Sequence, residues 1–165
     1  MDKEKWIISL VRRYERPLCS YAYSLLRNLE WARDVVQDTF LRLCGQNPEK
    51  LKGREAPWLF RVCRNRSLDV LRKEKPVESM SDPQEASMES EERHPDEHAA
   101  QNDLRSLLPR FLSKLPKNQQ EVIRLKFQQQ MSYREIAQCA QLSESNVGYL
   151  LHTGLKTLRE QMINL

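Results

Sequence analysis

The sequence predicts an all-α protein with two small helical domains joined by a flexible acidic linker. Leu, Arg, Glu, Gln, Lys and Ala dominate the composition, as helices prefer, and the 165 residues include only 4 glycines. Alternating runs of Val, Ile and Thr, which would indicate strands, are absent from the sequence. Hydrophobic residues make up 39% of the chain and charged residues 30%, which suits small domains with much surface better than one large core.

The charges fall into three blocks along the chain. Residues 1–73 carry 16 basic and 9 acidic side chains, residues 74–103 carry 2 and 10, and residues 104–165 carry 9 and 4. The middle block has three prolines and almost no aliphatic residues, so it cannot bury enough apolar surface to offset the entropy of ordering. We therefore predict domains at 1–73 and 104–165 with a flexible linker at 74–103. Two basic lobes suggest a polyanion that is contacted at two places.

Three helical patterns precede the linker. Apolar residues recur with a helical period in residues 3–27, 30–44 and 57–73. Pro17 should kink or break the first of these helices, whereas Pro57 suits the first turn of the third. The segment GQNPEKLKGREAP, which lies before that third helix, is predicted to be a loop from its glycines and prolines.

After the linker, helices are expected over residues 103–115 and 117–129, with Pro109 as a candidate kink in the first. The sequence S-Y-R-E from Ser132 matches a capping box, and Ser143 can cap the last helix.

The stretch MSYREIAQCAQLSESNVGYLLHTG matches a helix-turn-helix. Ala137 is small where the two helices would cross, a short turn falls around residues 140–142, and Val147 is apolar early in the second helix. An ordinary helical hairpin is the alternative interpretation.

The second helix of this motif has two distinct faces. Val147, Leu151, Leu155 and Leu158 are spaced to form a buried stripe. Side chains that can read bases lie opposite, and Gly148 would let the backbone approach DNA; the residues of this face are Ser145, Asn146, Tyr149, His152, Thr153 and Lys156. The helix has no Lys or Arg from Glu144 to Leu155, so DNA phosphates would be held elsewhere. The candidates are Arg124, Lys126, Arg134, Lys156 and Arg159.

Two N-terminal stretches carry further motifs. In DVVQDTFLRL, a helix places Asp34, Asp38 and Arg42 on one face, for which a solvated polar face is the simpler interpretation. In PWLFRVCRNRSLDVLRK, one helix side carries polar and basic residues and two aromatic residues stand near its start, a combination that suits single-stranded nucleic acid. Of these aromatic residues, Phe60 is expected to belong to the core instead.

Together these stretches resemble the extracytoplasmic-function (ECF) class of bacterial RNA polymerase sigma factors. DVVQDTFLRL looks like region 2.2 of that family, and WLFRVCRNRSLDVLRK looks like its region 2.3–2.4. LPKNQQEVIRLKFQQQMSYREIAQCAQLSESNVGYLLHTGLKTLRE looks like region 4. The three motifs occur in the family's order, and the resemblance covers nearly all of residues 5–160.

The resemblance implies roles for individual residues. It implies that core polymerase is bound, at the β′ clamp helices, by Asp34, Gln37, Asp38, Phe40 and Arg42. It implies that the −10 element is melted and read by Trp58, Arg61, Asn65, Arg66, Asp69 and Arg72. It implies that the −35 element is read by Arg134, Ser143, Ser145, Asn146, Gly148, Tyr149, His152, Thr153 and Lys156. Many family members have Lys or Arg at the positions of Gly148, Leu150, Thr153 and Leu155.

The implied partners are core RNA polymerase (β′ clamp helices and β flap), promoter DNA and an anti-sigma factor, without membrane insertion. A cytoplasmic protein with no catalytic residues, cofactor or metal is expected. His94 and His98 lie in a polar segment with no nearby Cys, and Cys19, Cys44, Cys63 and Cys139 are interpreted as buried thiols of a reducing compartment.

Two other functions are alternatives to a sigma factor. A helix-turn-helix regulator that binds DNA alone would need neither N-terminal motif. A small enzyme would need a phosphate loop, metal-ligand spacing or a nucleophile–base pair, and none of these is found in the sequence.

Overall fold

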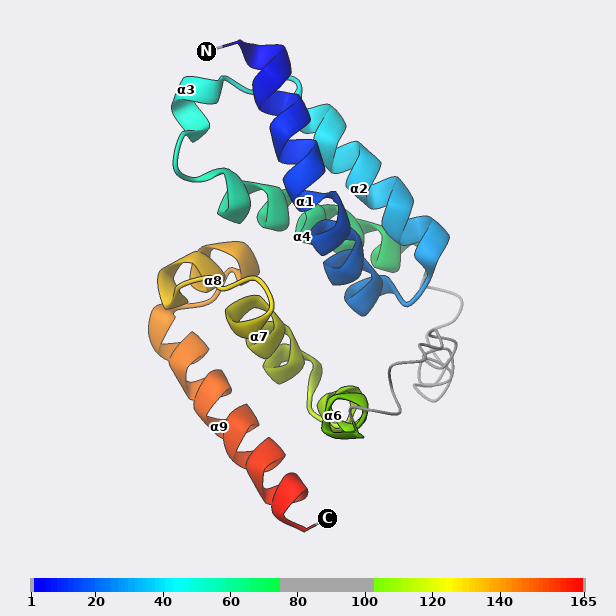
Figure 1. Ribbon diagram of the computed structural model, residues 1–165, viewed down its shortest axis with the longest axis vertical. Helices are drawn as coiled ribbons and strands as arrows, with labels where there is room; N and C mark the ends of the chain where they lie inside the picture. The colour runs from blue at the N-terminus through cyan, green and yellow to red at the C-terminus, as the bar shows by residue number, and fades with distance from the viewer. Residues whose placement is uncertain (1, 75–102, 165) are drawn as a thin grey trace. The chain divides into compact units, whose positions relative to one another are not determined.

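The computed structural model describes residues 2–74 and 103–164, and over these ranges every regular element is a helix (Figure 1). The helices are α1 (Lys3–Leu26), α2 (Leu29–Leu43), α3 (Pro48–Leu51), α4 (Glu55–Glu74), α6 (Asp103–Ser113), α7 (Lys117–Phe127), α8 (Tyr133–Ala140) and α9 (Glu144–Ile163). The all-α prediction is confirmed. The predicted linker, apart from its first and last residues, and the two histidines within it lie outside the described residues.

The helices belong to two compact units. The first contains α1 to α4 and residues 138–140 of α8, and the second contains α6, α7, α9 and residues 133–137 of α8. We refer to them as the N-terminal and C-terminal units. None of the helices within the described ranges is both long and apolar enough to cross a membrane.

The core of the N-terminal unit lies where α1, α2 and α4 pack on one another. Leu18 of α1 and Leu59 of α4 are fully buried, and Phe60 is 1% exposed. The Phe60 ring meets the ring of Tyr21 edge-on, with 5.4 Å between their centroids. Each such large apolar side chain contributes about 1.5–3 kcal/mol on burial, and the expectation that Phe60 belongs to the core is confirmed.

Pro17 does not break the first helix. α1 continues through it as one element of 24 residues, which begins at an Asp2 cap and ends at Arg27 in the left-handed conformation. A proline inside a helix costs roughly 3 kcal/mol because a hydrogen bond is lost. Leu10 and Trp6 before it and Leu18 and Tyr21 after it are all buried, and their packing offsets that cost.

The predicted loop between α2 and α4 contains the single helical turn α3. Its start is capped by Asn47, whose side-chain oxygen accepts the Glu49 N–H at 2.9 Å, and Pro48 occupies the first helical turn. An Asn cap followed by proline is a helix-start signal, but the glycines and prolines around it favoured a loop.

The C-terminal unit depends on close packing of α7 against α9. A Cβ atom on Gly154 of α9 would lie 2.9 Å from Ile123 Cδ1 and 3.3 Å from Gln119 Cβ of α7, so only glycine fits there without movement. Of the predicted buried stripe, Val147, Leu151 and Leu158 are buried. Leu155 was predicted wrongly, because it is only half-buried and the stripe instead includes the residues Leu150 and Gly154.

The four cysteines are free thiols in different surroundings. Cys63 and Cys139 are buried, as predicted, but Cys44 is exposed and Cys19 is half-buried. The prediction of four buried thiols was therefore wrong for Cys44, which follows the last residue of α2, and for Cys19, which is only partly covered. Burial raises the pKa of the Cys63 thiol from 9.0 to about 12.

Candidate functional surfaces

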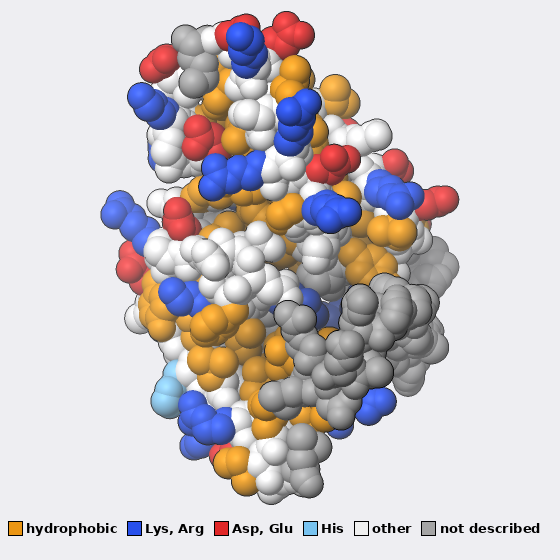
Figure 2. All heavy atoms as spheres, viewed as in Figure 1, with side chains coloured by type: hydrophobic (Ala, Val, Ile, Leu, Met, Phe, Trp, Pro, Cys, Tyr) orange, Lys and Arg blue, Asp and Glu red, His pale blue; other side chains and the backbone are white. Residues whose placement is uncertain are grey.

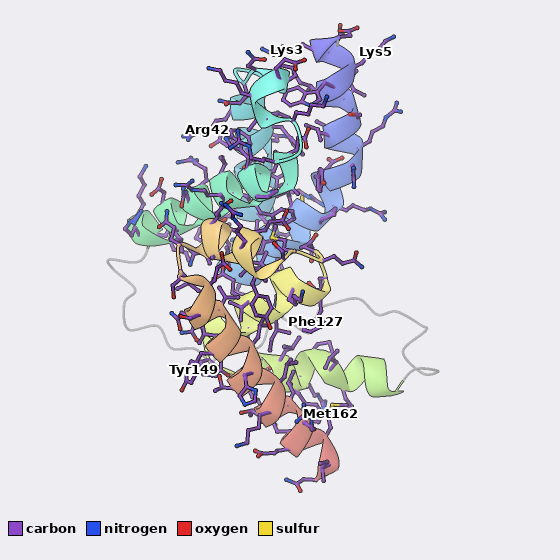
Figure 3. The ribbon with its side chains drawn as sticks, turned by 90° about the vertical axis from the view of Figure 1, so that its left-hand side faces the viewer. Lys3, Lys5, Arg42, Phe127, Tyr149 and Met162 are labelled. Atoms are coloured by element: carbon purple, nitrogen blue, oxygen red, sulfur yellow. The ribbon has the colours of Figure 1, made fainter. Side chains whose placement is uncertain are left out.

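One face of α2 is exposed and carries most of the region 2.2 motif. Asp34, Gln37 and Arg42 are exposed, while Val35 and Thr39 on the opposite side are buried. Figure 3 labels Arg42 at the surface of the N-terminal unit. Phe40 is half-buried. Because α2 buries one face only, the other is available to bind a partner.

Sequence reasoning did not include Leu41 among the site residues. Its side chain is 68% exposed, and it lies one helical turn after Gln37 on the face of α2 that carries Asp34. A large apolar residue so exposed between polar neighbours is typical of a binding surface. The signal was present in the sequence, since Leu41 shares the spacing of the polar residues.

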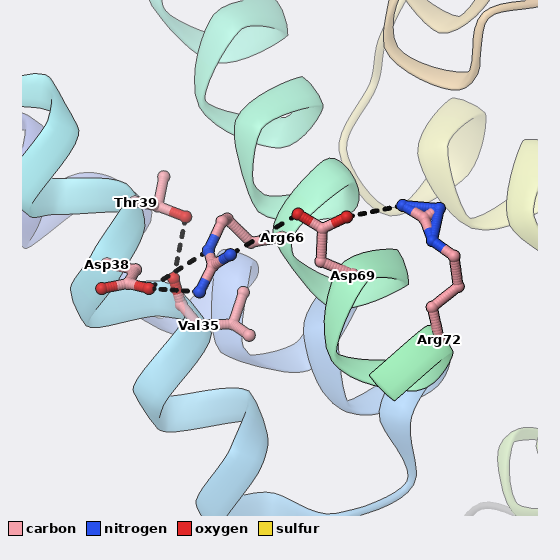
Figure 4. Close-up of polar contacts among 6 residues, drawn as sticks. All are labelled: Val35, Asp38, Thr39, Arg66, Asp69 and Arg72. Carbon is pink, nitrogen blue, oxygen red and sulfur yellow. Dashed lines mark hydrogen bonds and ion pairs between the residues drawn. The ribbon is translucent and has the colours of Figure 1, made fainter. Parts of the chain in front are cut away.

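The second acidic residue of the motif, Asp38, is hydrogen-bonded within the N-terminal unit (Figure 4). Its Oδ2 atom accepts two hydrogen bonds from Arg66 of α4, from Nη2 at 2.8 Å and from Nε at 3.1 Å. The Arg66 guanidinium also lies 3.5 Å from Asp69, and Asp69 accepts a hydrogen bond from Arg72 at 2.5 Å. Four charged groups of alternating sign therefore connect α2 to the C-terminal half of α4; we call this set the ion chain.

The ion chain lowers the pKa of one of its carboxyls. The hydrogen bond from Arg72 holds the pKa of the Asp69 carboxyl below its ordinary value, and the nearby Arg66 charge acts in the same direction. The carboxylate is thus kept charged between two cations.

The polar face of α4 agrees with the predicted side of the helix. Arg61, Asn65 and Arg72 are exposed and Asp69 is half-buried, while Leu59 and Cys63 are buried on the other side. Trp58 is half-buried near the start of the helix, so part of its ring remains accessible. Arg66, in contrast with these exposed residues, has a side chain that is only 25% exposed and is held by Asp38.

The predicted helix-turn-helix is formed by α8 and α9. The capping box at the start of α8 is complete: Ser132 Oγ accepts the Glu135 N–H at 3.1 Å, and Glu135 accepts the Ser132 N–H at 2.9 Å. Gln141, in the left-handed conformation with φ of 60°, ends α8. Ser143 then caps α9 by accepting the Asn146 N–H at 3.0 Å. All three local predictions are confirmed, and Ala137 and Val147 are buried as the helix-turn-helix requires.

The outer face of α9 carries most of the residues that sequence reasoning assigned to it. Ser145, Asn146, His152 and Lys156 are exposed, and the Tyr149 side chain is 64% exposed at the surface of the unit (Figure 3). Ser143 and Arg134 are also exposed, next to the starts of α9 and α8. These side chains form a polar surface on one edge of the helix-turn-helix.

Two members of the predicted reading face have different surroundings from those expected. The hydroxyl of Thr153 donates to the Tyr149 carbonyl at 2.9 Å and accepts from Gln119 Nε2 of α7 at 3.2 Å, so it is engaged with the fold. Gly148 is half-covered, because a Cβ atom there would lie 3.4 Å from the Tyr133 ring. The approach of DNA at Gly148 stays a prediction, whereas Gly154 is the glycine that close packing against α7 requires.

On the face drawn in Figure 2, Lys and Arg side chains are scattered among acidic and apolar ones over the described residues.

The described fold, with a helix-turn-helix unit and a second helical unit that exposes polar helix faces, defines a DNA-binding class of protein. The sigma-70 region 2 family model matches residues 10–77, and the sigma-70 region 4 model matches residues 105–158. The chain is 32% identical to the ECF RNA polymerase sigma factor SigL of Mycobacterium tuberculosis over 86% of this chain and 80% of the relative. It is 26% identical to the ECF sigma factor SigM of Bacillus subtilis over 93% of both chains.

Solved structures share the fold. The structure of the sigma factor RpoE in complex with the anti-sigma factor NepR, from Bartonella quintana, matches with a TM-score of 0.73 and 20% identity, over 96% of this chain and 97% of that one. The structure of CnrH in complex with the cytosolic domain of CnrY matches with a TM-score of 0.63 and 24% identity, over 98% and 90%. The chain belongs to the ECF family of RNA polymerase sigma factors, and it directs RNA polymerase to promoters at transcription initiation.

Proposed function

We propose that this sigma factor uses three helix faces: α2 for core RNA polymerase, α4 for the −10 element and α9 for the −35 element. The observation that carries the proposal is that each helix buries one face and exposes a polar one within its own unit. Domain boundaries at 1–73 and 104–165, with the acidic linker at 74–103 between them, accompany this assignment. No step needs a catalytic group from the chain, because polymerase performs the chemistry.

The α2 surface binds the β′ clamp helices. Asp34, Gln37 and Arg42 offer charged and hydrogen-bonding groups around Leu41, an apolar residue that a partner would cover. Interfaces of this kind bury a central apolar anchor within a polar rim. Phe40 adds apolar surface at the edge, and Asp38 contributes both to this surface and to the tie with Arg66.

The α4 surface binds the −10 element as its strands separate. Arg61 and Arg72 meet phosphates, Asn65 offers a two-way hydrogen-bonding amide to a base edge, and the accessible part of the Trp58 ring offers a stacking surface. Arg66 and Asp69 orient this face through the ion chain (Figure 4).

The α9 surface binds the −35 element in the major groove. Asn146 can pair with adenine through two hydrogen bonds, and Tyr149 can contact a thymine methyl group. Ser145 and His152 extend the surface, while Ser143, Arg134 and Lys156 flank it. Gly148 and Thr153 serve this surface by packing, since one lies against Tyr133 and the other bonds to α7. The β flap of core polymerase holds this unit.

An anti-sigma factor is a further proposed partner. One similar solved structure contains the sigma factor RpoE bound to the anti-sigma factor NepR, and another contains CnrH bound to the cytosolic domain of CnrY. A protein inhibitor that covers α2 or α9 would prevent holoenzyme formation or −35 binding. A cytoplasmic location follows from the proposed polymerase and DNA partners.

A charge-reversal experiment tests the α2 assignment. Asp34 is exposed and has no ion-pair partner among the described residues, so Asp34→Arg should leave the N-terminal unit folded. Binding to purified core polymerase should weaken at least about tenfold, as expected for reversing a charge in a complementary interface. Glu15→Arg, the same reversal at an exposed position of α1, is the matched control. Equal core affinity for both variants and the wild type would contradict the α2 assignment.

The −35 assignment is tested by promoter preference. Asn146→Ala and Tyr149→Ala should each lower the preference of the holoenzyme for an intact over a scrambled −35 element by roughly 5–150-fold, because a specific base contact is worth about 1–3 kcal/mol. An unchanged −35 preference in both variants would mean that the reading surface is elsewhere.

A further inference from the structure

A lysine lies over an aromatic ring next to the reading helix. The Lys126 ammonium of α7 is 5.4 Å from the centroid of the Tyr133 ring, and Tyr133 is the first residue of α8. The Tyr133 ring lies against Gly148 in the second turn of α9: a Cβ atom on that glycine would be 3.4 Å from Cε2 and 3.9 Å from Cδ2. Residues from α7, α8 and α9 therefore meet at one point of the C-terminal unit.

This meeting point lies at the surface. Tyr133 is 44% exposed, Tyr149 beside Gly148 is 64% exposed, and Lys126 is half-buried. Attraction between an ammonium group and the face of a tyrosine ring restricts where the lysine can point. A Cβ atom at residue 148 would make an ordinary van der Waals contact with this ring, so the ring packs directly on the early turns of α9.

The first three turns of α9 lack a cation that could bind a DNA phosphate, so a basic side chain on a neighbouring helix would have to supply that contact. From Glu144 to Leu155 the helix has no Lys or Arg, and Lys156 is twelve residues from its start, which is about 18 Å along a helix. In a helix-turn-helix, the N-terminal part of the second helix meets the bases while the first helix crosses the DNA backbone. Lys126 sits beside the start of the first helix and the early turns of the second, where a phosphate would pass.

We propose that Lys126 is a phosphate contact of the −35-binding surface, and that Tyr133, which packs against α9 at Gly148, is the positioning residue that holds its ammonium there. The ligand is the phosphodiester backbone of the promoter. The inference rests on the proposed −35 role of α9 and adds two residues from outside that helix.

The test measures how the affinity of the full-chain holoenzyme for a promoter fragment with a −35 element depends on salt. Each neutralised phosphate contributes about 0.9 to the slope of log affinity against log salt concentration. Lys126→Gln, which removes the charge and keeps a polar side chain, should lower the slope by about that amount. The affinity lost between 50 and 200 mM salt would then shrink by about threefold. Lys126→Arg should retain the wild-type slope.

A matched control is available in the same unit. The Lys114 ammonium lies 6.0 Å from the Phe111 ring, in the turn before α7 and thus at the other end of that helix from Lys126. Lys114→Gln removes the same charge from the same kind of ring contact and should leave the slope unchanged. A wild-type slope for Lys126→Gln, or an equal decrease for both variants, would overturn the phosphate contact.

The role of Tyr133 has its own test. Tyr133→Leu should lower the salt slope, and its effect should largely disappear in the Lys126→Gln background, whereas Tyr133→Phe should retain the wild-type slope because the ring remains. A decrease in affinity without a change of slope, or full additivity with Lys126→Gln, would overturn the positioning role. Asn146→Ala in the same assay separates this inference from the broader proposal. If Asn146→Ala alters the −35 preference while the Lys126 and Tyr133 variants keep the wild-type salt slope, only the Lys126 contact is contradicted and the −35 role of α9 stands.

Discussion

The hydrogen-bonded ion pair between Asp38 and Arg66 should couple the stability of the N-terminal unit to its binding of polymerase. Two N–H groups of Arg66 converge on Oδ2 of Asp38, at 2.8 and 3.1 Å, and join α2 to α4. Asp38→Asn removes the charge with little change of shape, and Arg66→Gln removes the guanidinium while keeping a polar side chain. These two variants and the double variant form a double-mutant cycle.

The magnitude follows from the geometry and exposure of the pair. The Arg66 and Asp38 side chains are 25% and 41% exposed, so water screens their attraction and the pair is closer to a surface ion pair than to a buried one. Exposed pairs measure about 0.2–1 kcal/mol, and two charge-assisted hydrogen bonds place this pair at the upper end. We expect a coupling energy of about 1 kcal/mol.

The assay uses the distribution of tryptophan in the chain. All three tryptophans, Trp6, Trp31 and Trp58, lie in α1, α2 and α4, so urea unfolding followed by tryptophan fluorescence reports the N-terminal unit. A coupling energy below about 0.3 kcal/mol would refute the argument, because it is within the additivity expected of independent sites.

Core polymerase binding by the same four proteins separates two roles of Asp38. If Asp38 contacts polymerase directly, Asp38→Asn should weaken core binding by a similar factor with Arg66 or Gln at position 66. If the loss vanishes in the Arg66→Gln background, Asp38 acts only through α4, and its place on the docking surface is wrong.

Three further predictions concern stability and protonation. Gly154→Ala should lower the free energy of unfolding of the C-terminal unit by about 1 kcal/mol, because overpacking against α7 exceeds the gain in helix propensity, whereas Gly148→Ala should be neutral or stabilising. Urea unfolding detected by tyrosine fluorescence distinguishes the two variants. Equal effects of the two substitutions on stability would contradict the close packing at Gly154. The N-terminal unit should lose stability as pH rises from about 9 to about 12, since the unfolded chain releases the Cys63 proton first, and Cys63→Ala should flatten that pH dependence of urea unfolding. The Asp69 carboxyl should titrate below its ordinary pKa in a carbon-13 NMR titration. Its pairing with the two arginines should therefore survive at moderately acidic pH and be lost only as pH falls through the lowered pKa. Arg72→Ala should raise the pKa of Asp69, and an unchanged pKa in this variant would exclude the hydrogen bond from Arg72 as the cause.

The elements of the fold were largely predictable because their signals are local. Apolar spacing marked the long helices, and the serine caps at Ser132 and Ser143 marked the starts of α8 and α9. Where a local rule failed, tertiary packing outweighed it: α1 continues through Pro17 because residues on both sides of the proline are buried. The single turn α3 was hidden by the prolines and glycines around it.

The site was predictable only in part. The spacing of Asp34 and Gln37 on α2, or of Asn146 and Tyr149 on α9, follows from one helix and needs no knowledge of the rest of the fold. Contacts between helices are different, because they join residues far apart in sequence. The Asp38–Arg66 pair spans 28 positions and the Thr153–Gln119 bond spans 34, so neither could be read from a pattern of a few residues.

The glycines of α9 illustrate the same limit. Two glycines six residues apart in one helix look alike in a sequence, and the free backbone of Gly148 suggested close approach to DNA. The structure assigns close helix packing to Gly154, where a Cβ atom would be 2.9 Å from Ile123, and gives Gly148 an ordinary contact with Tyr133. Which glycine is sterically required depends on α7, which the local sequence does not specify.

Promoter-specific run-off transcription with purified core polymerase tests the central claim most directly. Adding the wild-type chain should produce discrete transcripts from its cognate promoters that core polymerase alone does not make. Asp34→Arg should abolish them through loss of core binding, and Asn146→Ala should reduce them only on promoters that depend on the −35 element. If no promoter gains initiation over core alone, and the chain does not co-purify with core, the assignment as a sigma factor is contradicted.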